Sequence, residues 1–336
     1  MLMEESVTLR TAVIGVGHLG RQHARIHAVL AAEGRTEFVS VCDLAEATAR
    51  SVAAERETVW TTDWRTLVGK VDAVSLAVPT EAHCEVGCAL LEAGIHVLVE
   101  KPIARSLDEA DRMIAAAVRS GALLQVGHLE RFNPALVALR PHVRGPLYFE
   151  IHRVGEFTAR SLDIDVVLDL MIHDLDIVQW LVGETVEVTD VRAVGIPVLT
   201  NRVDAANARI EFANGAVANI TASRVGTEKI RKMRFFQPHD YVAVDYTTRR
   251  ASISSLAAAG LDAGARPGVH VRYPEVKDVE PLRAEIEAFI QAARDGSPSP
   301  VSGMEGRRAL ALALRALEKM LEHVENAGLT ALNRSL

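Results

Sequence analysis

Short runs of apolar, often β-branched residues alternate with amphipathic stretches along the first 125 residues of the chain. The runs have the length of strands, and they cover residues 9–14, 38–42, 73–78, 95–99 and 123–127. The stretches between them repeat apolar residues at three- and four-residue spacing, which is typical of helices. They cover residues 18–33, 44–56, 81–93 and 106–121. This alternation predicts a parallel, doubly wound α/β sheet of the Rossmann type.

The pattern changes after Gly127. Residues 165–182 predict one long helix, and from 186 to about 273 the pattern is that of mostly antiparallel strands. Asn214-Gly215 lies between two such runs and predicts a hairpin. Two more amphipathic helices are predicted over 281–294 and 304–324. We therefore expect a Rossmann domain over 1–126 and an α+β domain with a large, mostly antiparallel sheet over 127–336.

Composition narrows the class of protein. The 336 residues are 49% hydrophobic and 24% charged, which excludes a disordered, collagen-like or coiled-coil chain. A net charge of −7 provides no bulk positive field for nucleic acid or an anionic membrane. Three cysteines fit a reducing compartment. The N-terminus lacks the pattern of a signal peptide and the apolar runs are too short to span a membrane, so we expect a cytoplasmic protein.

A glycine-rich turn, Gly15-x-Gly17-x-x-Gly20, follows the first strand and opens the first helix. The first glycine permits the tight turn, the second lets the backbone approach a pyrophosphate, and the third lets helix and strand pack closely. The helix N-terminus then offers free N–H groups to phosphates. We expect the intervening His18 and Leu19 to line the same site. The turn predicts binding of a dinucleotide.

Asp43 ends the second strand, 23 residues after Gly20. A carboxylate at this position holds the ribose hydroxyls of the adenosine half and repels a 2′-phosphate. Leu44 and Ala45 follow it, so no arginine is adjacent. The sequence therefore predicts NAD rather than NADP as the cofactor.

Three further segments accompany the glycine turn. Glu100-Lys101-Pro102 follows the fourth strand, Pro79-Thr80-Glu81-Ala82-His83 follows the third, and 169–176 has the spacing D-x-x-x-H-x-x-D. Together they resemble the Gfo/Idh/MocA family of sugar and cyclitol oxidoreductases over nearly the whole chain. Details of the second half, at 130–134, 223–224 and 231–234, look most like the branch that acts on UDP-N-acetylglucosamine and related nucleotide sugars.

The resemblance implies the roles of several residues. It implies a cofactor site that includes Pro79, Thr80, Glu100 and Lys101, and it suggests His83 near the cofactor. It implies Lys101, Asp169 and His173 as the catalytic residues. It also implies a homodimer or homotetramer, which agrees with a sheet that needs one face covered.

The residues themselves support general-base chemistry. Asp169 and His173 are four apart and share one helix face, with Asp165 one turn earlier as an expected substrate contact. A neutral imidazole can take a hydroxyl proton while a carboxylate orients the ring. Lys101, after a strand's carboxyl end, can hydrogen-bond the reacting hydroxyl. We therefore expect Lys101 and His173 to act beside the nicotinamide ring; the alternative is an ordinary ion pair on a helix face.

Basic residues in the second half form a local excess, and guanidinium groups suit a diphosphate. The members are Arg153, Arg160, Arg224, Lys229, Arg231 and Arg234. Solvated strand faces or a subunit interface explain them equally well. Arg131 and Asn133 are also candidate substrate contacts, or caps of the following helix. We expect no metal, because Asp169, His173 and Asp176 share one helix and lack a distant fourth ligand.

These observations favour an NAD-dependent dehydrogenase that oxidises a ring hydroxyl of a sugar to a ketone. The expected substrate is a nucleotide sugar such as UDP-N-acetylglucosamine, oxidised at its 3-position. A free-sugar or inositol dehydrogenase of the same family is the alternative substrate class. A regulatory protein that senses NAD without turnover is the alternative of another kind.

Overall fold

The computed structural model describes residues 8–157, 164–256 and 268–329, and the chain forms two compact units. The first comprises Met1–Leu129 and Glu280–Leu310, and the second comprises Glu130–Val279 and Ala311–Leu336. The domain boundary at 126/127 stays a prediction. Residues 280–310, however, which the sequence pattern assigned to the second domain, pack in the first unit.

The first unit contains a six-stranded parallel sheet in the order β3-β2-β1-β4-β5-β6. Its strands are β1 (Arg10–Ile14), β2 (Glu37–Cys42), β3 (Val59–Thr61), β4 (Ala73–Leu76), β5 (His96–Glu100) and β6 (Leu124–Gly127). The strand order reverses between β1 and β4, which creates the topological switch point where such sheets bind ligands. This confirms the predicted Rossmann fold; the three-residue β3 is the one strand of this sheet that the pattern did not reveal.

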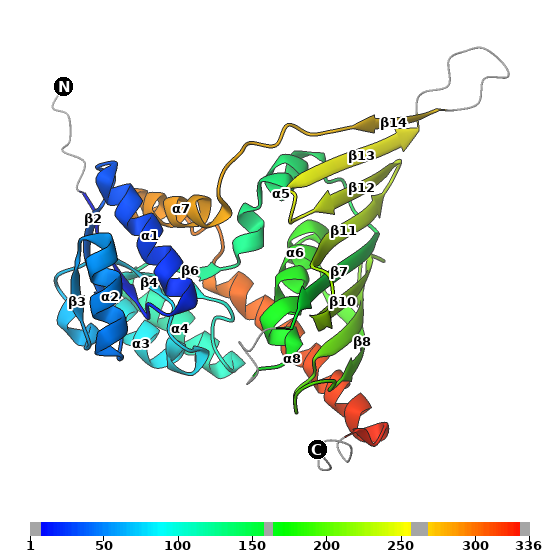
Figure 1. The fold of residues 1–336 in the computed structure, drawn as a ribbon. Coiled ribbons are helices and arrows are strands. Elements are labelled where there is room, and N and C mark those ends of the chain that lie inside the picture. Colours follow the sequence, from blue (N-terminus) through cyan, green and yellow to red (C-terminus); the bar gives the residue numbers. More distant parts are fainter. Residues whose placement is uncertain (1–7, 158–163, 257–267, 330–336) are drawn as a thin grey trace. The chain divides into compact units, whose positions relative to one another are not determined.

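Helices cover both faces of this sheet (Figure 1). They are α1 (His18–Ala32), α2 (Glu46–Arg56), α3 (Thr80–Glu92), α4 (Leu107–Ser120), α7 (Pro281–Asp295) and the start of α8 (Gly303–Asn326). A short 3-10 helix, η1, spans Trp64–Leu67. Helix α7 joins the unit because Ile286, Phe289 and Ile290 are buried in one core with Ile26 and Leu98. That burial explains why residues 280–310 return to the first unit.

The second unit contains an eight-stranded sheet in the order β14-β13-β12-β11-β7-β10-β9-β8. Its strands are β7 (Tyr148–Glu156), β8 (Val188–Ile196), β9 (Ala205–Phe212), β10 (Val217–Gly226), β11 (Ile230–Gln237), β12 (Asp240–Asp245), β13 (Arg250–Leu256) and β14 (Val269–Arg272). Only β7 and β10 pair in parallel. The antiparallel β9–β10 hairpin with Gly215 at φ +85° confirms the turn predicted at Asn214-Gly215.

One face of this sheet is covered by helices and the other face carries no described helix (Figure 1). The helices of this unit are η2 (Leu129–Phe132), α5 (Pro134–Leu139), η3 (Arg140–His142), η4 (Val167–Met171), α6 (Ile172–Val182) and the later part of α8. We call the uncovered side the open face. On it the rings of Tyr148, Phe236 and Tyr241 pack against one another.

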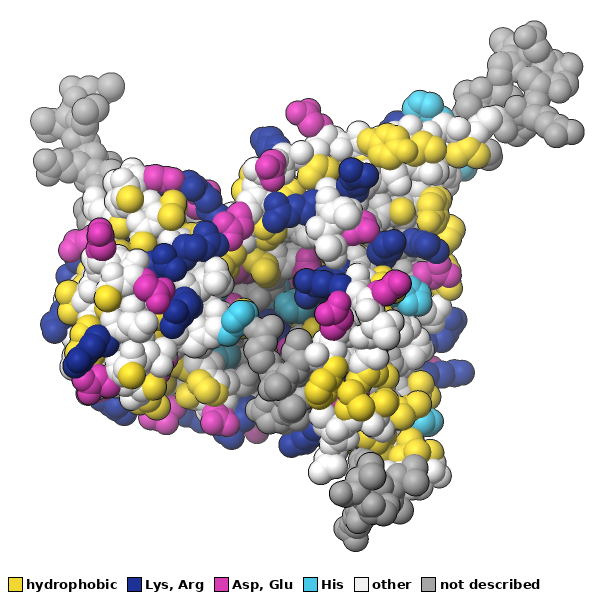
Figure 2. All heavy atoms as spheres, viewed as in Figure 1, with side chains coloured by type: hydrophobic (Ala, Val, Ile, Leu, Met, Phe, Trp, Pro, Cys, Tyr) yellow, Lys and Arg dark blue, Asp and Glu magenta, His cyan; other side chains and the backbone are white. Residues whose placement is uncertain are grey.

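Acidic and basic side chains intermingle on the visible face of each unit (Figure 2). None of the helices within the described ranges is both long and apolar enough to cross a membrane. Among the same residues, no three His, Cys, Asp or Glu side chains are grouped so that they could hold a metal ion.

Candidate active site

The glycine turn lies at the switch point, directly after β1. Gly15 has φ +82°, and a Cβ there would lie 2.6 Å from the backbone of Ala77. A Cβ on Gly20 would lie 1.7 Å from the Gly15 carbonyl oxygen, whereas one on Gly17 would meet no atom within 4 Å. Gly15 and Gly20 therefore let neighbouring backbone approach closely, whereas the space beside Gly17 is open.

This open space adjoins the N-terminus of α1. Gly17 is the N-cap residue, no side chain caps the helix, and its first turn holds no acid. The helix N–H groups are thus left for an anion, as the pyrophosphate of a dinucleotide requires. His18 and the 49%-exposed Leu19 lie on this first turn, as expected for residues beside a cofactor.

Asp43 follows β2 and is tied to the glycine turn. One carboxylate oxygen accepts the Val16 N–H and the other accepts the Ala45 N–H, both at 2.9 Å. These bonds leave lone pairs on both oxygens for ribose hydroxyls. The uncapped N-terminus of α1, the open space at Gly17 and the Asp43 carboxylate fit NAD. When bound, NAD supplies the acceptor for a hydride.

The remaining cofactor candidates lie at the same edge of the sheet. Pro79 caps α3 and Thr80 begins it, just after β4. Glu100 ends β5, and Lys101 comes next. Because β1, β4 and β5 are neighbours and parallel, their carboxyl ends meet at this edge. The structure thus places all eleven predicted cofactor residues at this edge.

His83 lies at the same edge, and it is 1% exposed. Its Nδ1 lies 3.0 Å from the Pro102 carbonyl oxygen and its Nε2 lies 3.0 Å from that of Val78. Burial lowers the pKa of His83, although the two carbonyls oppose this. Both ring nitrogens thus lie beside carbonyl oxygens of the loops after β4 and β5, and a place of His83 near the cofactor stays a prediction.

The helix with the proposed base belongs to the second unit and is not uniform. Residues 167–171 form one π-helical turn, η4, and α6 follows directly. The sequence pattern predicted a single helix, because the period of the apolar residues does not reveal a one-residue expansion of a turn. Asp169 lies on η4 and His173 in the first turn of α6, and both are partly exposed. Lys101 is in the other unit, so their joint action stays a prediction.

Two of the predicted substrate-binding arginines are instead buried in ion pairs beneath α6. Arg131 donates to both carboxylate oxygens of Asp176, at 2.7 and 2.8 Å. Arg153 binds Asp174 in the same bidentate way, at 2.7 and 2.8 Å, and also Glu130 at 2.9 Å. We correct the assignment of both arginines, since their donors serve carboxylates inside the protein.

Charge balance explains why these arginines stay ionised. Burial alone would lower the pKa of Arg153, but the negative charges of Asp174 and Glu130 raise it well above its ordinary value. Asn133 is likewise structural: its side chain accepts the Ala135 N–H and caps α5, the alternative that the sequence left open. Its amide also donates to the Tyr246 carbonyl.

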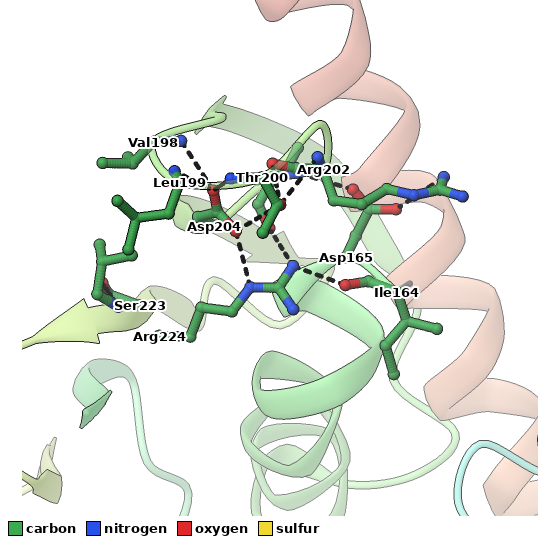
Figure 3. A network of polar contacts seen from close by, with 11 residues as sticks. Ile164, Asp165, Val198, Leu199, Thr200, Arg202, Asp204, Ser223 and Arg224 are labelled. Atoms are coloured by element: carbon green, nitrogen blue, oxygen red, sulfur yellow. Dashed lines mark hydrogen bonds and ion pairs between the residues drawn. The ribbon is translucent and has the colours of Figure 1, made fainter. Parts of the chain in front are cut away.

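A third arginine fixes the segment that leads into η4 and α6 (Figure 3). Arg224 donates to Asp204 at 2.9 Å and to the Ile164 carbonyl oxygen at 2.6 Å. Asp204 is fully buried and also accepts the N–H groups of three successive residues, Val198, Leu199 and Thr200. Asp165 accepts the Val203 N–H at 2.8 Å and is buried, so it anchors η4 rather than facing a substrate.

The other basic residues do not form one group. Arg231 lies on the covered face, directly opposite Arg153 in the β7–β11 pairing. Arg234, three residues on, lies on the open face and is exposed, and Lys229 is exposed just before β11. Arg160 lies outside the described residues. Burial and the charge of Arg153 lower the pKa of Arg231, and the smaller effects of the Glu130, Asp174 and Asp169 charges oppose this, which places Arg231 near these acids.

Sequence reasoning missed the buried acids Asp174 and Asp204 and the partly buried Glu130. A signal existed for Asp174, because an otherwise apolar helix with several carboxylates must pair those that it buries. Glu130 lies on the short helix η2 and Asp204 directly precedes β9, where exposure was the simpler expectation.

The fold and the cradle after β1 define an NAD-binding oxidoreductase. Residues 9–128 match the oxidoreductase family with an NAD-binding Rossmann fold, and residues 136–236 match the GFO/IDH/MocA C-terminal domain. The chain belongs to the Gfo/Idh/MocA family, as its motifs predicted, and it is an NAD-dependent enzyme of the kind that acts on sugar hydroxyls.

Relatives extend over nearly the whole chain. The UDP-N-acetylglucosamine 3-dehydrogenase of Acidithiobacillus ferrooxidans is 40% identical over 320 residues, covering 94% of this chain and 99% of its own. A solved structure of that enzyme has a TM-score of 0.87, with 95% and 99% covered. The inositol 2-dehydrogenase of Rhizobium meliloti is 28% identical, with 94% and 98% covered. A levoglucosan dehydrogenase in complex with NADH and levoglucosan shares the fold at 19% identity and a TM-score of 0.81, with 94% and 98% covered.

Proposed function

We propose that this protein oxidises a ring hydroxyl of a nucleotide sugar, UDP-N-acetylglucosamine at its 3-position, and transfers the hydride to NAD. The observation that carries the proposal is the 40% identity, over 94% of the chain, to an enzyme named for that reaction. Lys101, Asp169 and His173 supply the acid–base groups that the chemistry requires.

In this mechanism His173 acts as the general base. Its neutral imidazole accepts the proton of the reacting hydroxyl at a ring nitrogen, and Asp169 orients the ring and stabilises the imidazolium. The Lys101 ammonium donates a hydrogen bond to the same oxygen and stabilises developing negative charge on it. Buried pairs hold α6 and a network of backbone contacts holds the turn at Lys101, so both groups start from fixed positions.

Arg231 is our proposed contact for the anionic part of the substrate. No hydrogen bond or ion pair joins its guanidinium to another residue in the described ranges, in contrast to Arg131, Arg153 and Arg224. A half-buried guanidinium with free donors can bind a diphosphate in bidentate fashion. Arg160, outside the described residues, stays a candidate for the same role.

Substrate comparison tests the proposal. NADH formation is measured by absorbance with UDP-N-acetylglucosamine, with free N-acetylglucosamine and with myo-inositol. We expect turnover of the nucleotide sugar and a His173→Asn loss of about 10²–10⁴-fold in kcat. Arg231→Met is expected to raise KM for the nucleotide sugar by about 10- to 100-fold. Arg234→Met, on the same strand but the open face, is the matched control and should not change KM.

Two other outcomes would replace the proposal. Preference for inositol or a free sugar would favour the second substrate class, for which the inositol dehydrogenase relative is the motivation. NAD binding without turnover of any sugar would favour a sensor of NAD. The presence of Lys101, Asp169 and His173 in one chain argues against a sensor, which needs none of them.

We also propose that the open face forms a homodimer or homotetramer interface. Phe236 is 39% exposed and Val194 and Ile196 are 44% and 46% exposed, all on that face. Aromatic and apolar side chains interspersed with polar ones are typical of subunit interfaces. Light scattering is expected to give the mass of two or four chains; the mass of one chain would overturn this assembly.

A further inference from the structure

The turn at Glu100-Lys101-Pro102 is held from both sides by buried histidines. His23 belongs to α1, the helix that starts at the glycine turn, and His83 belongs to α3. Each is 1% exposed, and neither is adjacent to the turn in sequence. Family resemblance assigned one of them to the cofactor and did not single out the other.

His23 fixes the residue before Lys101. Its Nε2 lies 2.9 Å from one carboxylate oxygen of Glu100, and the other oxygen accepts the Lys101 N–H at 3.1 Å. The His23 Nδ1 is buried and has no hydrogen-bond partner among the described residues, which favours the tautomer with its hydrogen on Nε2. Glu100 therefore accepts one hydrogen bond from helix α1 and another from the backbone of the turn.

The space for this carboxylate is tightly defined. Gly127 pairs with Glu100 in the β5–β6 register, and a Cβ on Gly127 would lie 3.3 Å from both the Glu100 Cα and its Oε2. Burial raises the pKa of Glu100, but the hydrogen bond from His23, together with the charge and the backbone N–H of Lys101, holds it below its ordinary value. The side chain is thus an ionised acceptor in one position.

His83 fixes the residue after Lys101. Its ring lies between the carbonyls of Val78 and Pro102, which belong to the loops after β4 and β5. A neutral imidazole has one N–H and donates to one of these carbonyls at a time. In either tautomer the ring spaces the two loops, because both contacts are 3.0 Å.

We propose that His23 and His83 are positioning residues that clamp the backbone on either side of Lys101 and so aim its ammonium at the reacting hydroxyl. The inference rests on the proposed function for the role of Lys101. It adds that the two helices bordering the cofactor cradle also set the geometry of the lysine. A misplacement of about 1 Å at such a group can cost about 10²-fold in rate.

Hydrogen exchange tests the clamp without any substrate. In His23→Leu, the Lys101 N–H is expected to exchange more than about tenfold faster, while Val97 and Leu98 in β5 are unchanged. His27→Leu is the matched control: His27 is on the same helix, is equally buried, and contacts Thr11 and Ser75 instead of the turn. Unchanged exchange at Lys101, or an equal increase in the control, would overturn the proposal.

Kinetics then connect the clamp to catalysis. His23→Leu and His83→Leu should each lower kcat by about 10- to 100-fold and leave KM and the Kd of NAD within about threefold. His23→Gln and His83→Gln keep an N–H donor and should restore most of kcat. In a Lys101→Ala background the Leu substitutions should have no further effect on the residual rate. Equal losses in both backgrounds would overturn the proposal.

The variants are chosen so that failures can be separated. If a Leu variant does not fold, His23→Asn and His83→Asn are used instead, because the asparagine side chain is polar but shorter than histidine. If the wild-type protein turns over no sugar, the proposed function fails. The exchange result at the Lys101 amide still decides whether the clamp exists.

Discussion

The turn that carries Lys101 and the helix that carries Asp169 and His173 are held in place by different chemistry. The turn depends on glycines, backbone carbonyls and imidazoles, with one carboxylate. The helix rests on buried guanidinium–carboxylate pairs, Arg131–Asp176 and Arg153–Asp174, with Arg224–Asp204 at its start. Loss of one hydrogen bond at the turn leaves Glu100 its other partner and costs about 1–3 kcal/mol, whereas a buried carboxylate that loses its cation costs about 3–5 kcal/mol.

This contrast separates effects on function from effects on stability. Loss of a contact at the turn shifts Lys101 by a small distance and is expected to appear in kcat. Loss of an arginine under α6 leaves a carboxylate uncompensated and is expected to appear in unfolding. Tryptophans distinguish the units, because Trp60 and Trp64 lie in the first and Trp180 in the second. Trp180→Phe, or Trp60→Phe with Trp64→Phe, leaves fluorescence from one unit.

The largest expected effect is that of Gly20→Ala. Its Cβ would lie 1.7 Å from the Gly15 carbonyl oxygen, and backbone cannot move aside as a flexible side chain can. We expect the first unit to lose at least about 4 kcal/mol of stability, followed by denaturant with Trp60 and Trp64 as reporters. Gly20→Ala would thus be an exception in the first unit, where we otherwise expect substitutions near the Lys101 turn to lower kcat rather than stability.

Gly17→Ala is the control for that substitution, since its Cβ meets no protein atom within 4 Å. It should fold normally and weaken NAD binding by at least about tenfold, measured by calorimetry, because the methyl group occupies space that the pyrophosphate needs. Equal stability losses in the two variants would show that the turn is not packed as described.

Arg153→Met is expected to destabilise the second unit by about 3–5 kcal/mol. The substitution leaves Asp174, which is completely buried, and Glu130 without their cation. Unfolding followed by Trp180 fluorescence measures the loss. Arg153→Met combined with Asp174→Leu should recover part of the stability, because it removes the fully buried charge of Asp174 and leaves only Glu130, whose side chain is 12% exposed, without its cation.

Arg192→Met is the control for the buried pair. Arg192 binds Asp190 at 2.9 Å, but both side chains are exposed, at 77% and 42%. Its loss should cost less than about 1 kcal/mol. Similar costs for Arg153 and Arg192 would remove the distinction between the two regions.

His27 makes the first unit sensitive to acid. Burial, with a smaller effect of His23, lowers the pKa of His27 from 6.5 to about 3. Below about pH 6.5 the unfolded chain takes up a proton that the folded unit excludes, so stability falls as the pH drops through the window from 6.5 to 3. By pH 4 the loss should be about 3 kcal/mol relative to pH 7. His27→Gln should remove this contribution. If the free energy of unfolding, measured by denaturant titration, fell between pH 7 and pH 4 as much in His27→Gln as in the wild type, the assignment to His27 would be contradicted.

The same contrast explains what sequence reasoning achieved. The cofactor edge was predictable almost residue by residue, because glycine spacing, strand ends and Asp43 are local features with one structural meaning. The parallel sheet and the antiparallel second sheet followed from hydrophobic periodicity in the same way. The return of α7 to the first unit was not predictable, because an amphipathic helix does not specify which core buries it.

The substrate side was predicted less well for a physical reason. A guanidinium recognises an internal carboxylate and an external diphosphate with the same geometry. Sequence therefore could not separate Arg131 and Arg153, which pair inside the protein, from Arg231, which does not. The place of His83 in a cofactor motif likewise does not show which way its ring points, and the structure turns the ring between two backbone carbonyls.

The smallest expected effect on stability is that of a substitution at Glu285, and it is a gain in stability rather than a loss. This α7 residue is fully buried, and neither of its carboxyl oxygens has a hydrogen-bond partner among the described residues. Burial and the nearby charge of Glu100 raise the pKa of Glu285 well above its ordinary value. Between the unfolded pKa and this raised value, the folded unit holds one proton more than the unfolded chain, so its stability falls as pH rises.

Glu285→Gln removes the titrating group and should therefore stabilise the first unit. We expect a gain of about 1–3 kcal/mol at pH 8 and almost none at pH 4, measured by denaturant unfolding in the Trp180→Phe background. Glu85→Gln, on the exposed side of α3, should change stability by less than about 0.5 kcal/mol at either pH. A loss of stability in Glu285→Gln at pH 8 would mean that the carboxylate is ionised and compensated in the folded unit. The first region would then depend on buried charge as the second does, and the contrast between them would fail.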